Sequence, residues 1–86
     1  MMGSWRELIA EEMESSNDSG PLIACTLDGA GLDRSFGCGY GCSEGAPFTA
    51  WTATRVYFPV VYDGAEWVGS APRNPCDEES YHHGGQ

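Results

Sequence analysis

The first hydrophobic pattern along the chain has the period of an α-helix. Apolar side chains recur every three or four positions and share one face. These residues are Trp5, Leu8, Ile9 and Met13. Ser4 and Glu7 have the spacing of a capping box, in which each side chain accepts a hydrogen bond from a free amide at the helix start. The pattern predicts a helix over residues 4–15, ended by the turn-forming stretch SSNDSGP.

The second pattern, over residues 48–71, alternates as in β-strands. The sequence YDGA is typical of a two-residue hairpin turn at Asp63–Gly64. With that turn, Val60 faces Trp67. The preceding FTAWT predicts a third strand, whose pairing has to end near Pro59 because proline has no N–H to donate. We therefore expect a three-stranded antiparallel meander.

Alternation divides the side chains of the hairpin between two faces. We expect one face to form the core, with Val56, Phe58, Val60, Tyr62 and Trp67. The other face carries Arg55, Tyr57, Val61 and Glu66. Tyrosine, arginine and valine together have the composition of an interface. The alternative is that the segment 36–47 folds over this second face and buries it.

The remaining segments give weaker signals. LIACTL (22–27) fits either a short strand or one buried helical turn, and residues 22–47 contain a glycine-rich stretch that predicts an irregular loop. Residues 74–86 show no periodicity and predict a flexible acidic tail. We expect a single α+β domain over residues 1–86, with the helix packed on the meander and the glycine-rich loop between them.

The charge of the chain limits its partners. Thirteen Asp and Glu residues stand against four Arg and no Lys, giving a formal net charge of −9. Such a balance opposes direct binding of nucleic acid and of anionic membranes, both of which rely on clustered basic residues. No run of 18 apolar residues and no basic, apolar leader is present. We expect a cytoplasmic protein whose thiols are reduced.

Four cysteines are the candidate metal ligands: Cys25, Cys38, Cys42 and Cys76. Zinc sites commonly have two residues between paired cysteines, whereas three residues separate Cys38 from Cys42. His82 and His83 stand next to each other in the tail. We favour free thiols and no cofactor.

Catalytic motifs are also missing from the sequence. No Gly-x-Ser-x-Gly, Walker or His-Glu-x-x-His pattern occurs, and both histidines lie in the predicted tail. We expect a protein that is not an enzyme.

The segment FTAWTATRVYFPVVYDGAEWVGSAPR, with the upstream GYG and EGAPF, resembles small accessory proteins of tailed bacteriophages and prophages. The likeness extends from WRELIAEEME to PRNPC. It implies an accessory protein of the bacterial cytoplasm that binds and inhibits a host protein, such as one that handles nucleic acid or serves in defence. The alternative is a zinc-stabilised structural or assembly component of a phage particle. The candidate partner-binding residues are Glu7, Glu11, Glu14, Arg55, Tyr57 and Glu66.

Overall fold

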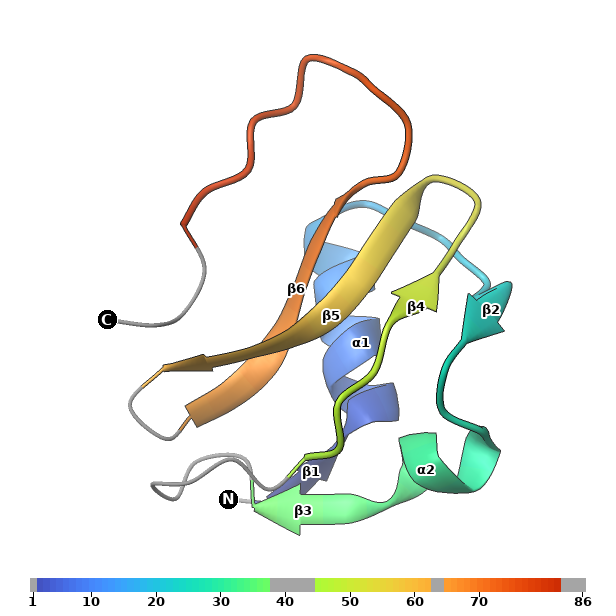
Figure 1. Cartoon of the computed structure of the whole chain (residues 1–86), viewed down its shortest axis with the longest axis vertical. Coiled ribbons are helices and arrows are strands. Elements are labelled where there is room, and N and C mark those ends of the chain that lie inside the picture. Colours follow the sequence, from blue (N-terminus) through green and yellow to red (C-terminus); the bar gives the residue numbers. More distant parts are fainter. Residues whose placement is uncertain (1, 38–44, 63–64, 83–86) are drawn as a thin grey trace.

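A computed structural model describes residues 2–37, 45–62 and 65–82 (Figure 1). The elements in chain order are β1 (Met2–Ser4), α1 (Trp5–Ser15), β2 (Ala24–Cys25), α2 (Gly29–Asp33), β3 (Ser35–Gly37), β4 (Ala50–Trp51), β5 (Arg55–Tyr62) and β6 (Ala65–Pro72). The strands form two antiparallel sheets, one of β1 and β3 and one with the order β2-β4-β5-β6. The α+β class is confirmed. The three-stranded meander is wrong in extent, because β2 adds a strand to it and β1 pairs with β3 separately.

The start of α1 forms as its sequence predicts. The amide of Glu7 donates to Ser4 Oγ at 3.3 Å, and the amide of Ser4 donates to Glu7 Oε1 at 3.1 Å. This reciprocal pair satisfies two amides that have no partner within the helix. The capping box is therefore confirmed.

The end of α1 is made by a residue in the left-handed conformation. Asn17 has a φ of 60°, and its amide donates to the carbonyl of Glu14 at 3.2 Å. The amide of Asp18 donates to the carbonyl of Met13 at 2.8 Å. These two bonds are those of a Schellman motif, which turns the chain away from the helix axis. The helix thus ends within SSNDSGP, as predicted.

The pairing register of the hairpin is confirmed. In the β5–β6 ladder, Val60 lies opposite Trp67. In the β4–β5 ladder, Ala50 lies opposite Tyr57, and the pairing stops short of Pro59. This is the outcome that the missing amide hydrogen of proline requires. The predicted turn at Asp63–Gly64 lies outside the described residues.

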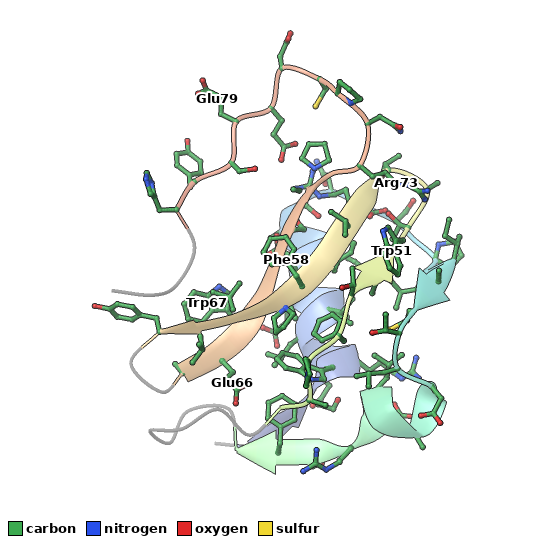
Figure 2. The ribbon with its side chains drawn as sticks, viewed as in Figure 1. Trp51, Phe58, Glu66, Trp67, Arg73 and Glu79 are labelled. Atoms are coloured by element: carbon green, nitrogen blue, oxygen red, sulfur yellow. The ribbon has the colours of Figure 1, made fainter. Side chains whose placement is uncertain are left out.

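The helix covers the face of the hairpin that we expected to be the outer one. Tyr57 is 0% exposed and Val68 is 2% exposed. The hydrophobic core consists of Trp5, Ile9, Leu32, Phe36, Phe48, Ala50, Tyr57 and Val68. Phe58 and Trp67 point to the opposite face, which is turned away from α1 (Figures 1 and 2). The prediction that the Phe58 and Trp67 face forms the core against the helix is wrong.

Gly69 explains how the face without the helix is covered. It lies opposite Phe58, and a Cβ added at Gly69 would lie 2.8 Å from Phe58 Cε1 and 2.9 Å from Val60 Cγ2. The aromatic ring therefore lies directly against the glycine backbone, a pairing that shields a glycine within a sheet. Val60 is 7% exposed on this face. The face that carries Phe58 and Trp67 therefore buries apolar side chains against the strands of its own sheet.

Trp5 joins β3 to the segment that precedes β4. Its indole ring lies 4.7 Å from the ring of Phe36 and 4.8 Å from the ring of Phe48, both in tilted arrangements. Its Nε1 donates to the carbonyl of Ala46 at 2.9 Å. A Cβ at Gly45 would lie 2.4 Å from Trp5 Cζ2, so only glycine allows this approach.

In the segment 22–47, residues 22–37 are more ordered than predicted, because they contain β2, α2 and β3, while most of the glycine-rich stretch lies outside the described residues. In α2, the amide of Gly31 donates to Asp28 Oδ1 at 2.8 Å and caps the helix start. Leu32 is buried from α2, while Phe36 is buried from β3. The strand alternative for residues 22–27 is the one that forms, at Ala24–Cys25.

We predict that Trp5→Ala destabilises the protein far more than Trp67→Ala. Loss of the buried Trp5 should cost about 3–5 kcal/mol, which approaches the whole stability of a small domain. Trp67 is only half-buried, so its loss should cost about 1–2 kcal/mol. Urea unfolding followed by circular dichroism measures both values. Equal costs, or a larger cost for Trp67→Ala, would show that the helix lies on the other face.

Candidate functional site

Five of the six predicted binding residues fall into two groups, and Arg55 is described separately below. Glu7, Glu11 and Glu14 are exposed along α1. Tyr57 is 0% exposed and Glu66 is 6% exposed, both on the hairpin face that α1 covers. The prediction that these two side chains form an exposed outer patch is wrong.

The alternative prediction, in which the segment 36–47 covers this face, is confirmed only next to Glu66, because α1 covers the face around Tyr57. The amide of Gly45 lies 3.3 Å from each carboxylate oxygen of Glu66 and donates to them. Glu66 points toward this segment from β6 (Figure 2). Burial of a carboxylate is costly unless hydrogen bonds satisfy it, and this contact supplies one. Glu66 therefore helps to hold the sheet against the segment that precedes β4.

Arg55 is the centre of a polar network beside the end of α1. Its Nε and Nη2 donate to Ser70 Oγ at 3.1 and 3.0 Å. Its Nη1 and Nη2 donate to Glu78 Oε1 and Oε2, both at 2.9 Å. The side chain of Arg55 is 12% exposed. Ser70 Oγ in turn donates to Glu12 Oε2 at 2.6 Å. The network joins α1, the hairpin and the C-terminal segment.

A second polar group lies next to this network, centred on Asp18. Tyr57 Oη and Thr52 Oγ1 each donate to Asp18 Oδ2 at 2.6 Å, and the amide of Gly20 donates to Asp18 Oδ1 at 2.9 Å. The sequence analysis missed Asp18, although its place directly after the helix stop is a signal for side chains that bond to nearby backbone. Nothing in the sequence pattern indicated Ser70 or Thr52.

Hydrogen bonding and burial set the charges of the Asp18 group. Partial burial acts to raise the pKa of Asp18, but the hydrogen bonds from Thr52, Tyr57 and Gly20 outweigh it and lower the pKa below its usual value. Burial raises the pKa of Tyr57 to about 12, and its hydrogen bond to the Asp18 carboxylate adds to this effect. Asp18 is thus held as an anion and Tyr57 as a neutral donor.

In the ion pair between Arg55 and Glu78, hydrogen bonding likewise stabilises the charged form of each group. The hydrogen bond to Glu78 is the main cause that raises the pKa of Arg55, and the hydrogen bond from Arg55 is the main cause that lowers the pKa of Glu78. General acid–base catalysis depends on groups whose pKa lies near the working pH. The shifts move the pKa values of the acids Asp18 and Glu78 down and those of Tyr57 and Arg55 up, in each case further from neutral pH. The arrangement therefore holds fixed charges in position rather than a group ready to exchange protons.

A cavity of about 390 Å³ opens beside Arg55. The C-terminal segment leaves β6, arches away from the sheet and carries Glu79 (Figure 2). The cavity is lined by Glu12, Ser15, Ser16, Arg55, Ser70, Glu78, Glu79, Ser80 and Tyr81. The polar groups of this lining are hydroxyls and carboxylates around one guanidinium.

The thiols do not converge within the described part of the chain. Cys25 is half-buried and Cys76 is exposed, and both are free. No group of three or more His, Cys, Asp or Glu residues among residues 2–37, 45–62 and 65–82 is placed to hold a metal ion. Cys38 and Cys42 lie outside these ranges, so the zinc alternative stays a prediction.

Comparison of the chain with protein-family models, with curated proteins and with solved structures finds no match. Neither helix of the described residues is long and apolar enough to cross a membrane.

We predict that the stability of the protein falls between pH 10 and 12 because of Tyr57. Its pKa in the folded state is raised to about 12 from 10.0, so the neutral hydroxyl stabilises the fold fully below pH 10. As the pH rises, the unfolded chain ionises first, and the stabilisation is lost progressively up to pH 12. The loss should be on the order of 2 kcal/mol. Urea unfolding at pH 9 and pH 11 measures about half of this loss, because pH 11 lies midway between the two pKa values.

Tyr57→Phe is the test variant for this effect. It should be less stable at pH 9 and should lose less stability than the unmodified protein on going to pH 11. Tyr62→Phe is the matched control, because Tyr62 lies on the same strand and is 46% exposed. If Tyr57→Phe and the unmodified protein show the same fall, the assignment of the alkaline transition to Tyr57 is wrong.

Proposed function

We propose that the chain is a non-enzymatic binding protein of the phage accessory type. In this proposal, it engages a basic surface on a bacterial host protein and inhibits that protein in the cytoplasm. The contact surface is the α1 acidic face, defined as Glu7, Glu11 and Glu14. All three side chains are exposed, on the side of the helix away from the buried Trp5 and Ile9.

The observation that supports this proposal most is how the arginines are used. Arg6 forms an ion pair with Asp33, and Arg55 forms one with Glu78. Arg73 Nη1 donates to the carbonyl of Thr52 at 2.8 Å. Three of the four arginines therefore have partners within the protein. The net charge of −9 is carried mainly by side chains that are exposed to solvent.

Electrostatics indicates the kind of partner. A surface with a strong excess of one sign attracts oppositely charged proteins and speeds their association. Basic surfaces are typical of proteins that bind the phosphate backbone. A host nuclease, polymerase or defence complex that handles nucleic acid fits this description. An acidic protein competes with the nucleic acid for such a surface.

We predict that affinity capture from bacterial lysate recovers a specific host protein at about 50 mM salt and loses it at about 500 mM salt, because screening weakens contacts between exposed charges. The variant Glu11→Gln, Glu14→Gln should recover up to about tenfold less, since two lost contacts of around 0.5–1 kcal/mol each total about 1–2 kcal/mol. Glu7 is left intact because it caps the helix. Quantitative mass spectrometry of the captured proteins gives the readout.

The matched control is Asp77→Asn, Glu79→Gln. It removes the same two negative charges from the exposed C-terminal segment instead of α1. Retained capture by this variant places the contact on α1. Equal loss in both variants shows that net charge alone drives recovery, and recovery of no specific protein at either salt concentration contradicts the proposal.

A further inference from the structure

We propose that Arg55 is the centre of a binding site for the carboxylate of an acidic peptide, and that the chain's own residues 77–79 occupy this site in the present structure. The proposal uses the cavity beside the end of α1 and does not depend on the α1 acidic face. Three features support it: the support of Arg55 by the body of the fold, the exposure of its present partner, and the charge of the surroundings.

Arg55 is held in place by contacts that do not involve the C-terminal segment. Two of its nitrogens donate to Ser70 Oγ at 3.1 and 3.0 Å, and Glu12 fixes that hydroxyl at 2.6 Å. The Arg55 amide donates to Thr52 Oγ1 at 3.0 Å. The guanidinium is thus positioned by α1, β5 and β6, and its Nη1 and Nη2 remain directed at the bound carboxylate. A guanidinium fork fixed in this way is suited to bidentate recognition of a carboxylate.

The present occupant is held much less firmly than its receptor. The side chain of Glu78 is 46% exposed, against 12% for Arg55. Residues 73–82 are all exposed. When Glu78 departs, the Arg55 Nη1 and Nη2 donors directed at it lose their acceptor, which favours its replacement by another carboxylate. Arg6 and Asp33 differ, because both side chains are exposed, at 53% and 62%, and neither needs replacement.

The surroundings favour a carboxylate over a more highly charged anion. Glu12 lies in the same network and Asp18 in the adjoining one. A single negative charge on the ligand is balanced by Arg55, whereas a dianionic phosphate meets repulsion from these two acids. The hydroxyl of Ser15 in the cavity can donate to a backbone carbonyl of a bound peptide. A short peptide with one acidic side chain at the Arg55 fork fits best.

Because the occupant belongs to the same chain, an outside peptide competes with a tethered one. Tethering through a short linker corresponds to an effective concentration in the millimolar range. The C-terminal segment therefore acts as a latch that raises the concentration of outside peptide needed to fill the site. Removal of the acids in the latch should expose the site.

The test uses the full chain with Asp77→Asn, Glu78→Ala and Glu79→Gln, so that no neighbouring acid takes the place of Glu78. The probe is a synthetic peptide of residues 74–82 with serine in place of Cys76, followed by NMR of the Arg55 Nε–Hε signal. We expect a saturable shift of this signal. The unmodified chain should need at least about tenfold more peptide, because its own latch competes.

Two further peptides separate specific recognition from general attraction, and they carry the same net charge. The peptide with Glu78→Gln should bind at least about tenfold more weakly, and the peptide with Glu79→Gln should bind like the first. Arg55→Lys in the latch variant should abolish binding, because lysine lacks the planar fork. The peptide comparison needs no substitution beyond those of the latch variant, so it stays decisive if Arg55→Lys fails to fold. Equal binding of both Gln peptides, or no shift of Arg55 at any concentration, overturns the proposal.

Discussion

The buried hydroxyl of Tyr57 is the constraint on which the arrangement of helix and sheet depends. Tyr57 is 0% exposed, and a buried hydroxyl without a hydrogen-bond partner costs free energy of about 1–3 kcal/mol. Asp18 meets this need at 2.6 Å. Asp18 reaches the hydroxyl because α1 ends at the left-handed Asn17 and turns toward the sheet. The helix stop and the strand position are therefore linked by one hydrogen bond.

The same region carries the charge network that defines the candidate site. Thr52 donates to Asp18 through its hydroxyl and receives the amide of Arg55 on the same oxygen. Arg55 then donates to the hydroxyl of Ser70, which donates to Glu12 on α1. Arg55 also donates to Glu78 in the C-terminal segment. Polar groups buried at the seam between helix and sheet thus continue to the surface as one connected network. Such a network specifies one packing of the helix, because any other leaves polar groups unsatisfied.

The candidate site could be predicted from the sequence only in part. Alternation correctly placed Arg55, Tyr57 and Glu66 on one face of the hairpin, and the helical period correctly placed Glu11 and Glu14 away from the core. The partners Asp18, Ser70 and Glu78 were not predicted as parts of the site. Each lies at least 15 positions from Arg55 in the chain, and no local rule of spacing relates residues so far apart.

The sequence by itself determined the local features: the capping box at Ser4, the helix stop, and the register that pairs Val60 with Trp67. These depend on contacts within a few residues, on a short turn and on the missing amide hydrogen of Pro59. Only the tertiary structure decided which face of the hairpin the helix covers. Both faces carry large apolar side chains, and a period of two says which residues share a face but not which face is covered. Phe58 packs over Gly69 on one face, while the other has the Tyr57 hydroxyl that Asp18 satisfies directly after the end of α1.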